Sequence, residues 1–135
     1  KDAEALAQYQ KAIELQPGNS RAYAGLGMVQ YRQKKFDLAY AAFQKAIELD
    51  PTYTVAYGFA AWCKYTLGEY DAALPLFQKA VEFQPGNATN RAGLGWCHYY
   101  MQQYTEAWTE FRKALEINPE LDLAKKGIAA LEKKQ

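Results

Sequence analysis

Residues able to carry out acid–base or nucleophilic chemistry are few in this sequence. His98 is the single histidine, and Cys63 and Cys97 are the two cysteines. His98 directly follows Cys97, but adjacent residues of a helix do not face each other, so they cannot form a nucleophile–base pair. A zinc site needs about four ligands, which these three residues cannot supply. We therefore expect no catalytic residues, no metal and no cofactor.

The glycine pairs do not form a phosphate-binding loop. Gly25-x-Gly27 and Gly93-x-Gly95 lie inside segments whose apolar residues have helical spacing, and no strand precedes them. Glycine inside a helix costs about 1 kcal/mol relative to alanine. We therefore interpret these glycines as points of close helix–helix approach.

Composition excludes several classes of protein. Half of the residues are hydrophobic and 15% are aromatic, too many for a disordered segment. The net charge of +1 offers no single-sign field for a nucleic acid, and no apolar stretch is long enough for membrane insertion. The chain opens on a segment of helical character, so we expect it to be part of a longer protein. Two cysteines are too few for a disulfide framework, and buried free thiols weakly favour a reducing compartment such as the cytoplasm.

A fixed repeat organises the chain. Prolines recur at a constant interval, at Pro17, Pro51, Pro85 and Pro119. The segments that end at these prolines are nearly identical: QKAIELQP, QKAIELDP, QKAVEFQP and RKALEINP. A period of this length predicts stacked supersecondary units.

The pattern resembles the tetratricopeptide repeat, a helix–turn–helix unit of about 34 residues. Its signature is a bulky residue and Leu-Gly on the first helix, then Ala-x-x-x-Phe and a closing proline on the second. The matching residues are Tyr23, Leu26-Gly27, Ala39-x-x-x-Phe43 and Pro51, then Tyr57, Ala73-x-x-x-Phe77 and Pro85, then Leu94-Gly95, Ala107-x-x-x-Phe111 and Pro119. Two departures are Ala60-Ala61 in place of Leu-Gly and Arg91 in place of the bulky residue.

This resemblance implies an all-α fold, a right-handed α-solenoid of antiparallel helix pairs with about eight helices. We expect helices over 3–15, 20–33, 36–49, 54–67, 70–83, 88–101, 104–117 and 120–133. Residues 1–135 should form a single array: a half repeat over 1–19, full repeats over 20–53, 54–87 and 88–121, and a capping helix over 122–135. Leu6, Tyr9 and Ile13 of the half repeat should be only partly covered.

In this family the first helix of each pair lines a concave groove, and five positions of that helix point into it. The fifth positions are small here: Ala24, Gly58 and Ala92. The groove residues implied by the resemblance are Met28, Tyr31, Arg32, Trp62, Tyr65, Trp96, Tyr99 and Tyr100. Chaperone-binding members hold an acidic tail with lysine and asparagine at such positions. The corresponding groove positions of these three repeats hold neither lysine nor asparagine, which disfavours an acidic tail as partner.

Two aromatic rows, Met28/Trp62/Trp96 and Tyr31/Tyr65/Tyr99, would supply contact area at low entropy cost. We expect the tryptophans to lie outside the packing between helices. We therefore predict a non-enzymatic scaffold that binds a protein or peptide segment in this groove. A carbohydrate or small ligand stacked on the same rings is the alternative. A third possibility is self-association through the groove or the exposed first helix.

Overall fold

The computed structural model describes residues 1–135 and contains eight α-helices and no strand. The helices are α1 (Asp2–Leu15), α2 (Ser20–Arg32), α3 (Phe36–Leu49), α4 (Val55–Thr66), α5 (Tyr70–Phe83), α6 (Ala88–Tyr100), α7 (Tyr104–Ile117) and α8 (Asp122–Glu132). Every boundary lies within about two residues of the predicted one, the usual spread at helix ends. The helical period in the sequence therefore predicted the elements correctly.

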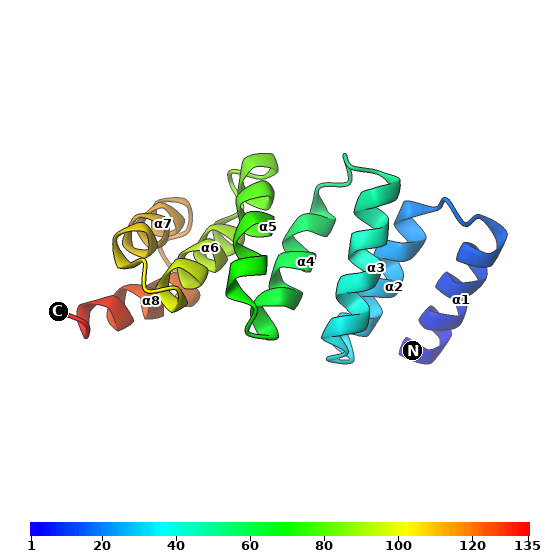
Figure 1. The fold of residues 1–135 in the computed structure, drawn as a ribbon, viewed down its shortest axis with the longest axis horizontal. Helices are drawn as coiled ribbons and strands as arrows, with labels where there is room; N and C mark the ends of the chain where they lie inside the picture. Colours follow the sequence, from blue (N-terminus) through cyan, green and yellow to red (C-terminus); the bar gives the residue numbers. More distant parts are fainter. The chain divides into compact units, whose positions relative to one another are not determined.

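The chain divides into two compact units, Lys1–Leu67 and Gly68–Gln135. The boundary falls in the turn between α4 and α5, inside the predicted repeat 54–87. In the first unit α1 packs on α2, α2 on α3 and α3 on α4 (Figure 1). In the second unit α5 packs on α6, α6 on α7, and α8 on both α6 and α7. Each unit thus buries its helix faces between neighbours in the chain.

Asparagine caps begin two of the first helices of the repeats. The Asn19 side chain accepts a hydrogen bond from the backbone N–H of Ala22 at 3.1 Å, and the Asn87 side chain accepts one from Asn90 at 3.0 Å. Such caps satisfy N–H groups that have no partner within the helix. The preceding Pro-Gly-Asn sequence thereby sets where α2 and α6 start.

The turns inside the helix pairs share one backbone conformation. Lys34 and Gln102 have φ of 63°, and Gly68 has φ of 80°. These residues occupy the same position of successive repeats, so each repeat uses the left-handed region at the same point. Only Gly68 is of the residue type that adopts this region without steric cost.

The core of the first unit lies around Phe43 of α3. Its ring is fully buried, and a Cβ added at Gly27 of α2 would lie 3.0 Å from it. Phe43 also stacks on Phe59 of α4, with ring centroids 5.3 Å apart. Tyr9 of α1 covers Gly25 in the same way. Both glycines therefore permit close ring–helix contact, as expected from the sequence.

Helix α1 has no fully buried residue. Leu6, Tyr9 and Ile13 are only half-buried, which confirms that this helix is covered on one side.

The core of the second unit lies around Phe111 of α7, which is held between α6 and α8. A Cβ at Gly95 would lie 2.7 Å from the ring, and Gly127 of α8 also lies against the ring. Ala124 and Leu131 complete the buried contact of α8. The last helix is therefore packed into the core along one face, as a capping helix requires.

Arg91 takes the place of the bulky residue of the repeat and forms an ion pair. Its guanidinium donates to the Glu110 carboxylate of α7 at 3.2 Å, and both side chains are only 15% exposed. A polar contact between α6 and α7 thus replaces the apolar one.

Candidate functional site

Three aromatic side chains form the centre of a face on α6. Trp96 lies three residues before Tyr99 and four before Tyr100, so all three project from neighbouring positions of the helix. Ring centroids are 5.1 Å apart for Trp96 and Tyr99, 5.7 Å for Trp96 and Tyr100, and 5.4 Å for Tyr99 and Tyr100. Three of the eight predicted groove residues therefore contact one another.

Two further tyrosines join this face. Tyr70, at the start of α5, stacks on Tyr100 with centroids 4.6 Å apart. Tyr104, at the start of α7, lies 5.6 Å from Tyr99. We refer to Tyr70, Trp96, Tyr99, Tyr100 and Tyr104 as the tyrosine face.

Sequence reasoning missed Tyr70 and Tyr104, because the second helix of a repeat was not expected to reach the groove. A signal was present in the sequence. Phe36, Tyr70 and Tyr104 recur at the same interval as the prolines, so the second helix of each pair begins with an aromatic residue.

The Trp96 side chain is held within the protein by a hydrogen bond and a ring contact. Its indole N–H donates to the backbone carbonyl of Leu123 in α8 at 2.9 Å, and its ring lies 5.3 Å from the buried ring of Phe111. The expectation that this tryptophan lies outside the packing between helices is therefore wrong. Trp96 therefore contacts the other rings of the tyrosine face and also attaches α6 to α8, so only part of its ring is available to a partner.

The predicted groove residues of α2 lie in different surroundings. Tyr31 packs inward, 5.2 Å from Phe36 and 6.1 Å from Phe59. Burial is the main cause that raises the pKa of Tyr31, and a hydrogen bond with Thr66 partly offsets it. Met28 is 37% exposed.

Arg32, also on α2, is exposed and donates to the Asp2 carboxylate of α1 at 3.2 Å. An exposed pair of this kind contributes about 1 kcal/mol or less.

Trp62 and Tyr65 of α4 form an edge-to-face pair with centroids 5.2 Å apart, and both are half-buried. They belong to the first unit, whereas Trp96, Tyr99 and Tyr100 belong to the second. The rows that would join these residues into one continuous groove stay a prediction.

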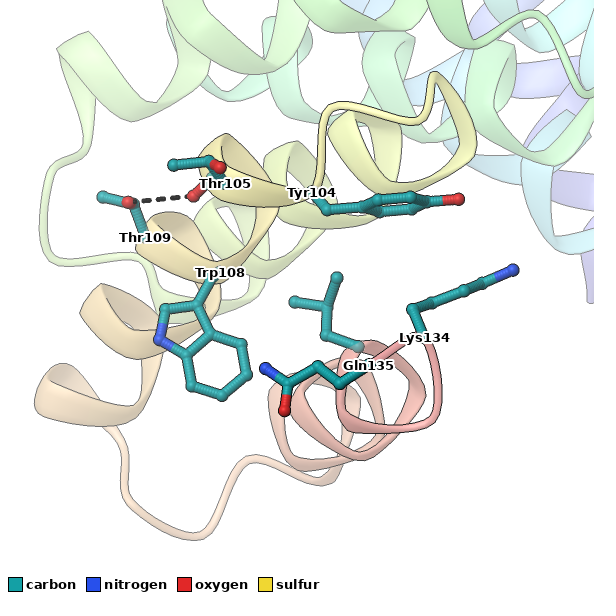
Figure 2. Close-up of a pocket in the computed structure, with 7 residues that line it drawn as sticks. Tyr104, Thr105, Trp108, Thr109, Lys134 and Gln135 are labelled. Atoms are coloured by element: carbon teal, nitrogen blue, oxygen red, sulfur yellow. Dashed lines mark hydrogen bonds between the residues drawn. The ribbon is translucent and has the colours of Figure 1, made fainter.

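A separate cleft lies between α7 and α8. Tyr104 and Trp108 project from successive turns of α7 (Figure 2), and they line the cleft together with Leu131 of α8 and with Gln135, which follows the end of α8. Thr105, Thr109 and Lys134 complete the lining of this cavity of about 380 Å³. Thr109 donates its hydroxyl to the Thr105 carbonyl at 3.1 Å.

Neither the two cysteines nor the histidine is placed as an activated nucleophile or a general base. Cys63 and Cys97 are free and buried, and burial raises the pKa of each thiol to about 12. The His98 Nδ1 is 2.7 Å from the side-chain oxygen of Gln103. No group of three or more His, Cys, Asp or Glu side chains is placed to hold a metal ion. None of the helices combines the length and apolar character needed to cross a membrane.

The sequence matches models of a known protein family. Three family models match the chain: "Tetratricopeptide repeat" over residues 20–53, "TPR repeat" over 1–34, and a further "Tetratricopeptide repeat" model over 65–131. No curated protein matches the chain.

Among solved structures, a crystal structure of MamA has a TM-score of 0.90 at 22% identity, covering 96% of this chain and 75% of that one. The Arabidopsis OM64 TPR domain has a TM-score of 0.81 at 24% identity, covering 86% of this chain and 96% of that one. The first TPR of Spaghetti (RPAP3), bound to the HSP90 peptide SRMEEVD, has a TM-score of 0.81 at 19% identity, covering 85% and 91%. At these identities the likeness concerns the fold alone.

The matching models, the eight helices without a strand and these structural neighbours confirm the predicted all-α fold. The chain belongs to the tetratricopeptide repeat family.

Proposed function

We propose that this chain is a protein-interaction scaffold and that the tyrosine face on α6 is a surface where it binds a segment of another polypeptide. The RPAP3 domain is described as bound to a peptide, so the fold is compatible with such a role.

The observation that carries the proposal is the position of Tyr100. Tyr100 is 48% exposed although its ring stacks with both Tyr70 and Trp96. A large ring held in one orientation at the surface loses little entropy when a partner covers it. Binding hot spots are enriched in such tyrosine and tryptophan side chains.

The test is selection of a phage-displayed peptide library on the 135-residue chain, followed by fluorescence anisotropy with a selected peptide. We expect Tyr100→Ala to weaken binding by about 2 kcal/mol or more, because it removes a rigid aromatic contact. Phe83→Ala is the matched control, since Phe83 is an exposed aromatic residue at the end of α5, outside the tyrosine face. Equal affinities for the Tyr100 variant and the unaltered chain, with both folded by circular dichroism, would refute the proposal.

A carbohydrate or small ligand is the second candidate, and the cleft between α7 and α8 favours it. Tyr104 and Trp108 offer aromatic surfaces, while Thr105, Thr109 and Gln135 offer hydroxyl and amide groups. Sugars are held by such a combination of ring stacking and polar contacts. In this case soluble oligosaccharides should change the tryptophan fluorescence, and Trp108→Phe should reduce that change.

Self-association is the third candidate, and the half-buried apolar side of α1 is the surface that supports it. Sedimentation of the chain over a hundredfold range of concentration tests it. A sedimentation coefficient that stays constant at the monomer value would exclude it.

A further inference from the structure

A cavity bordered by lysines lies beside the tyrosine face. Tyr99 of α6 contributes one wall, and the C-terminal part of the second unit contributes Lys126, Ala130, Lys133 and Lys134. The cavity has a volume of about 450 Å³. Because Lys126, Ala130 and Lys133 follow one another at helical spacing, they lie along one face of α8 and its C-terminal end. We call this cavity the lysine pocket.

The charges in the lysine pocket are not neutralised by the protein. Lys126 and Lys133 form no ion pair. The Lys134 ammonium lies 5.8 Å from the ring centroids of both Tyr99 and Tyr104. By contrast, the adjacent Lys125 donates to the Glu120 carboxylate at 3.1 Å and does not line the pocket.

No carboxylate lines the pocket. The whole chain has a net charge of only +1, so three lysines in a lining that holds no carboxylate are a local concentration of charge. Complementary charge steers association and selects partners. The pocket is therefore suited to an anionic partner.

The spacing of the lysines indicates how that charge is distributed. The helical rise from Lys126 to Glu132, the last residue of α8, is about 9 Å, and Lys133 and Lys134 lie just beyond that end. A single terminal carboxylate spans much less than this distance. Several side-chain carboxylates along one segment match it better.

The fifth position of the repeat differs between the helices. It is Ala24, Gly58 or Ala92 in the three full repeats, whereas Lys126 stands at the corresponding point of α8, one repeat length after Ala92. The reason to disfavour an acidic partner therefore applies to the first three positions and not to α8.

We propose that the lysine pocket binds an internal acidic segment of a partner protein, with two or more Asp or Glu carboxylates on Lys126, Lys133 and Lys134 and an apolar side chain against Tyr99. This inference rests on the proposed function, because Tyr99 belongs to both the pocket and the tyrosine face. It adds the chemical class of the partner.

The probe is a short fluorescein-labelled peptide, acetylated and amidated at its ends, with four glutamates around one central leucine. Its control carries glutamine at the four positions. In anisotropy titrations with the 135-residue chain we expect the acidic peptide to bind at least tenfold more tightly than the control. Raising sodium chloride from about 0.05 to about 0.5 M should weaken binding severalfold, because exposed charges are screened.

Variants assign the binding to the pocket. Lys126→Gln with Lys133→Gln should lower the affinity at least tenfold, whereas Lys125→Gln should change it less than twofold. All three lysines are exposed, so the thermal melts of the variants should coincide with that of the unaltered chain. Equal losses in the two variants, or equal binding of the acidic and glutamine peptides, would overturn the proposal. A short single-stranded oligonucleotide that binds as tightly as the acidic peptide would also overturn it.

The Tyr100 variant and the double lysine variant test the tyrosine face and the lysine pocket separately. If a library-selected peptide loses affinity with Tyr100→Ala but not with the double lysine variant, the tyrosine face stands and the acidic partner is wrong. If neither variant affects any peptide, both are wrong.

Discussion

Lys34 and Gln102 both have a backbone φ of 63°, where Cβ crowds the neighbouring carbonyl. The corresponding residue of the middle turn is Gly68, which has no Cβ and meets nothing within 4 Å of the Cβ position. We predict that Lys34→Gly and Gln102→Gly will each raise the free energy of unfolding by about 0.5–1 kcal/mol, a part of the left-handed cost. Lys45→Gly, inside α3, should lower it by about 1 kcal/mol. Urea denaturation checks all three, and destabilisation by glycine at residues 34 and 102 would contradict the interpretation.

The buried thiols make stability depend on pH in the alkaline range. Burial raises the pKa of Cys63 and Cys97 from 9.0 to about 12. Between these values the unfolded chain loses protons that the folded chain keeps, so the free energy of unfolding falls as pH rises. The contribution is complete below pH 9 and declines by about 1.4 kcal/mol per pH unit for each thiol above it.

Urea unfolding at pH 8, 9 and 10 measures this decline, with a Cys63→Ala, Cys97→Ala variant as reference for the tyrosines and lysines that titrate in both proteins. The variant should show a shallower decline. Parallel curves for the two proteins would show that the thiols ionise equally in the folded and unfolded chains.

At the level of secondary-structure elements, α8 has two roles. It closes the core around Phe111 through Gly127, and its Leu123 carbonyl accepts the hydrogen bond of Trp96. It also carries the lysines of the lysine pocket. The helix that the sequence marked as a polar cap is therefore both a lid on the core and part of a candidate binding surface.

Removal of residues 120–135 should expose Phe111 and the lower face of Trp96 together. A newly exposed apolar surface of a few hundred Å² promotes association. We expect light scattering to show oligomers of the shortened chain at concentrations where the 135-residue chain is monomeric. A shortened chain that remains monomeric, with its helical content otherwise unchanged, would show that α8 is not needed to cover the core.

For the whole molecule, we propose from the constant period of the prolines that the repeats 20–53, 54–87 and 88–121 act as one array. Nearest-neighbour contacts in such an array couple the unfolding of its repeats. We predict a single unfolding transition for the units Lys1–Leu67 and Gly68–Gln135.

Tryptophan fluorescence separates the two units. Trp62 alone reports on the first unit after Trp96→Phe and Trp108→Phe, while Trp62→Phe leaves reporters only in the second. In each variant the fluorescence midpoint in urea should coincide with the circular dichroism midpoint of the whole chain, as two-state unfolding requires. Separate midpoints would mean that the units unfold independently.

The sequence by itself determined the eight helices and the family. Prolines at a strict interval and apolar residues at helical spacing are signals that can be read along the chain without its tertiary contacts. The interpretation of Gly25, Gly27 and Gly95 as points of close approach is also confirmed, since the rings of Tyr9, Phe43 and Phe111 respectively lie against them. These features depend on the order of residues along the chain.

Only the tertiary structure decided what each aromatic side chain does. Tyr31 and Tyr99 occupy the same repeat position, yet Tyr31 packs against Phe36 and Phe59 while Tyr99 borders an open cavity. The spacing of residues places a side chain on a helix face but does not show which neighbouring helix covers that face. The roles of Trp96 and of Lys126 likewise depend on how α8 packs against α6, a contact between segments far apart in the sequence that no local pattern records.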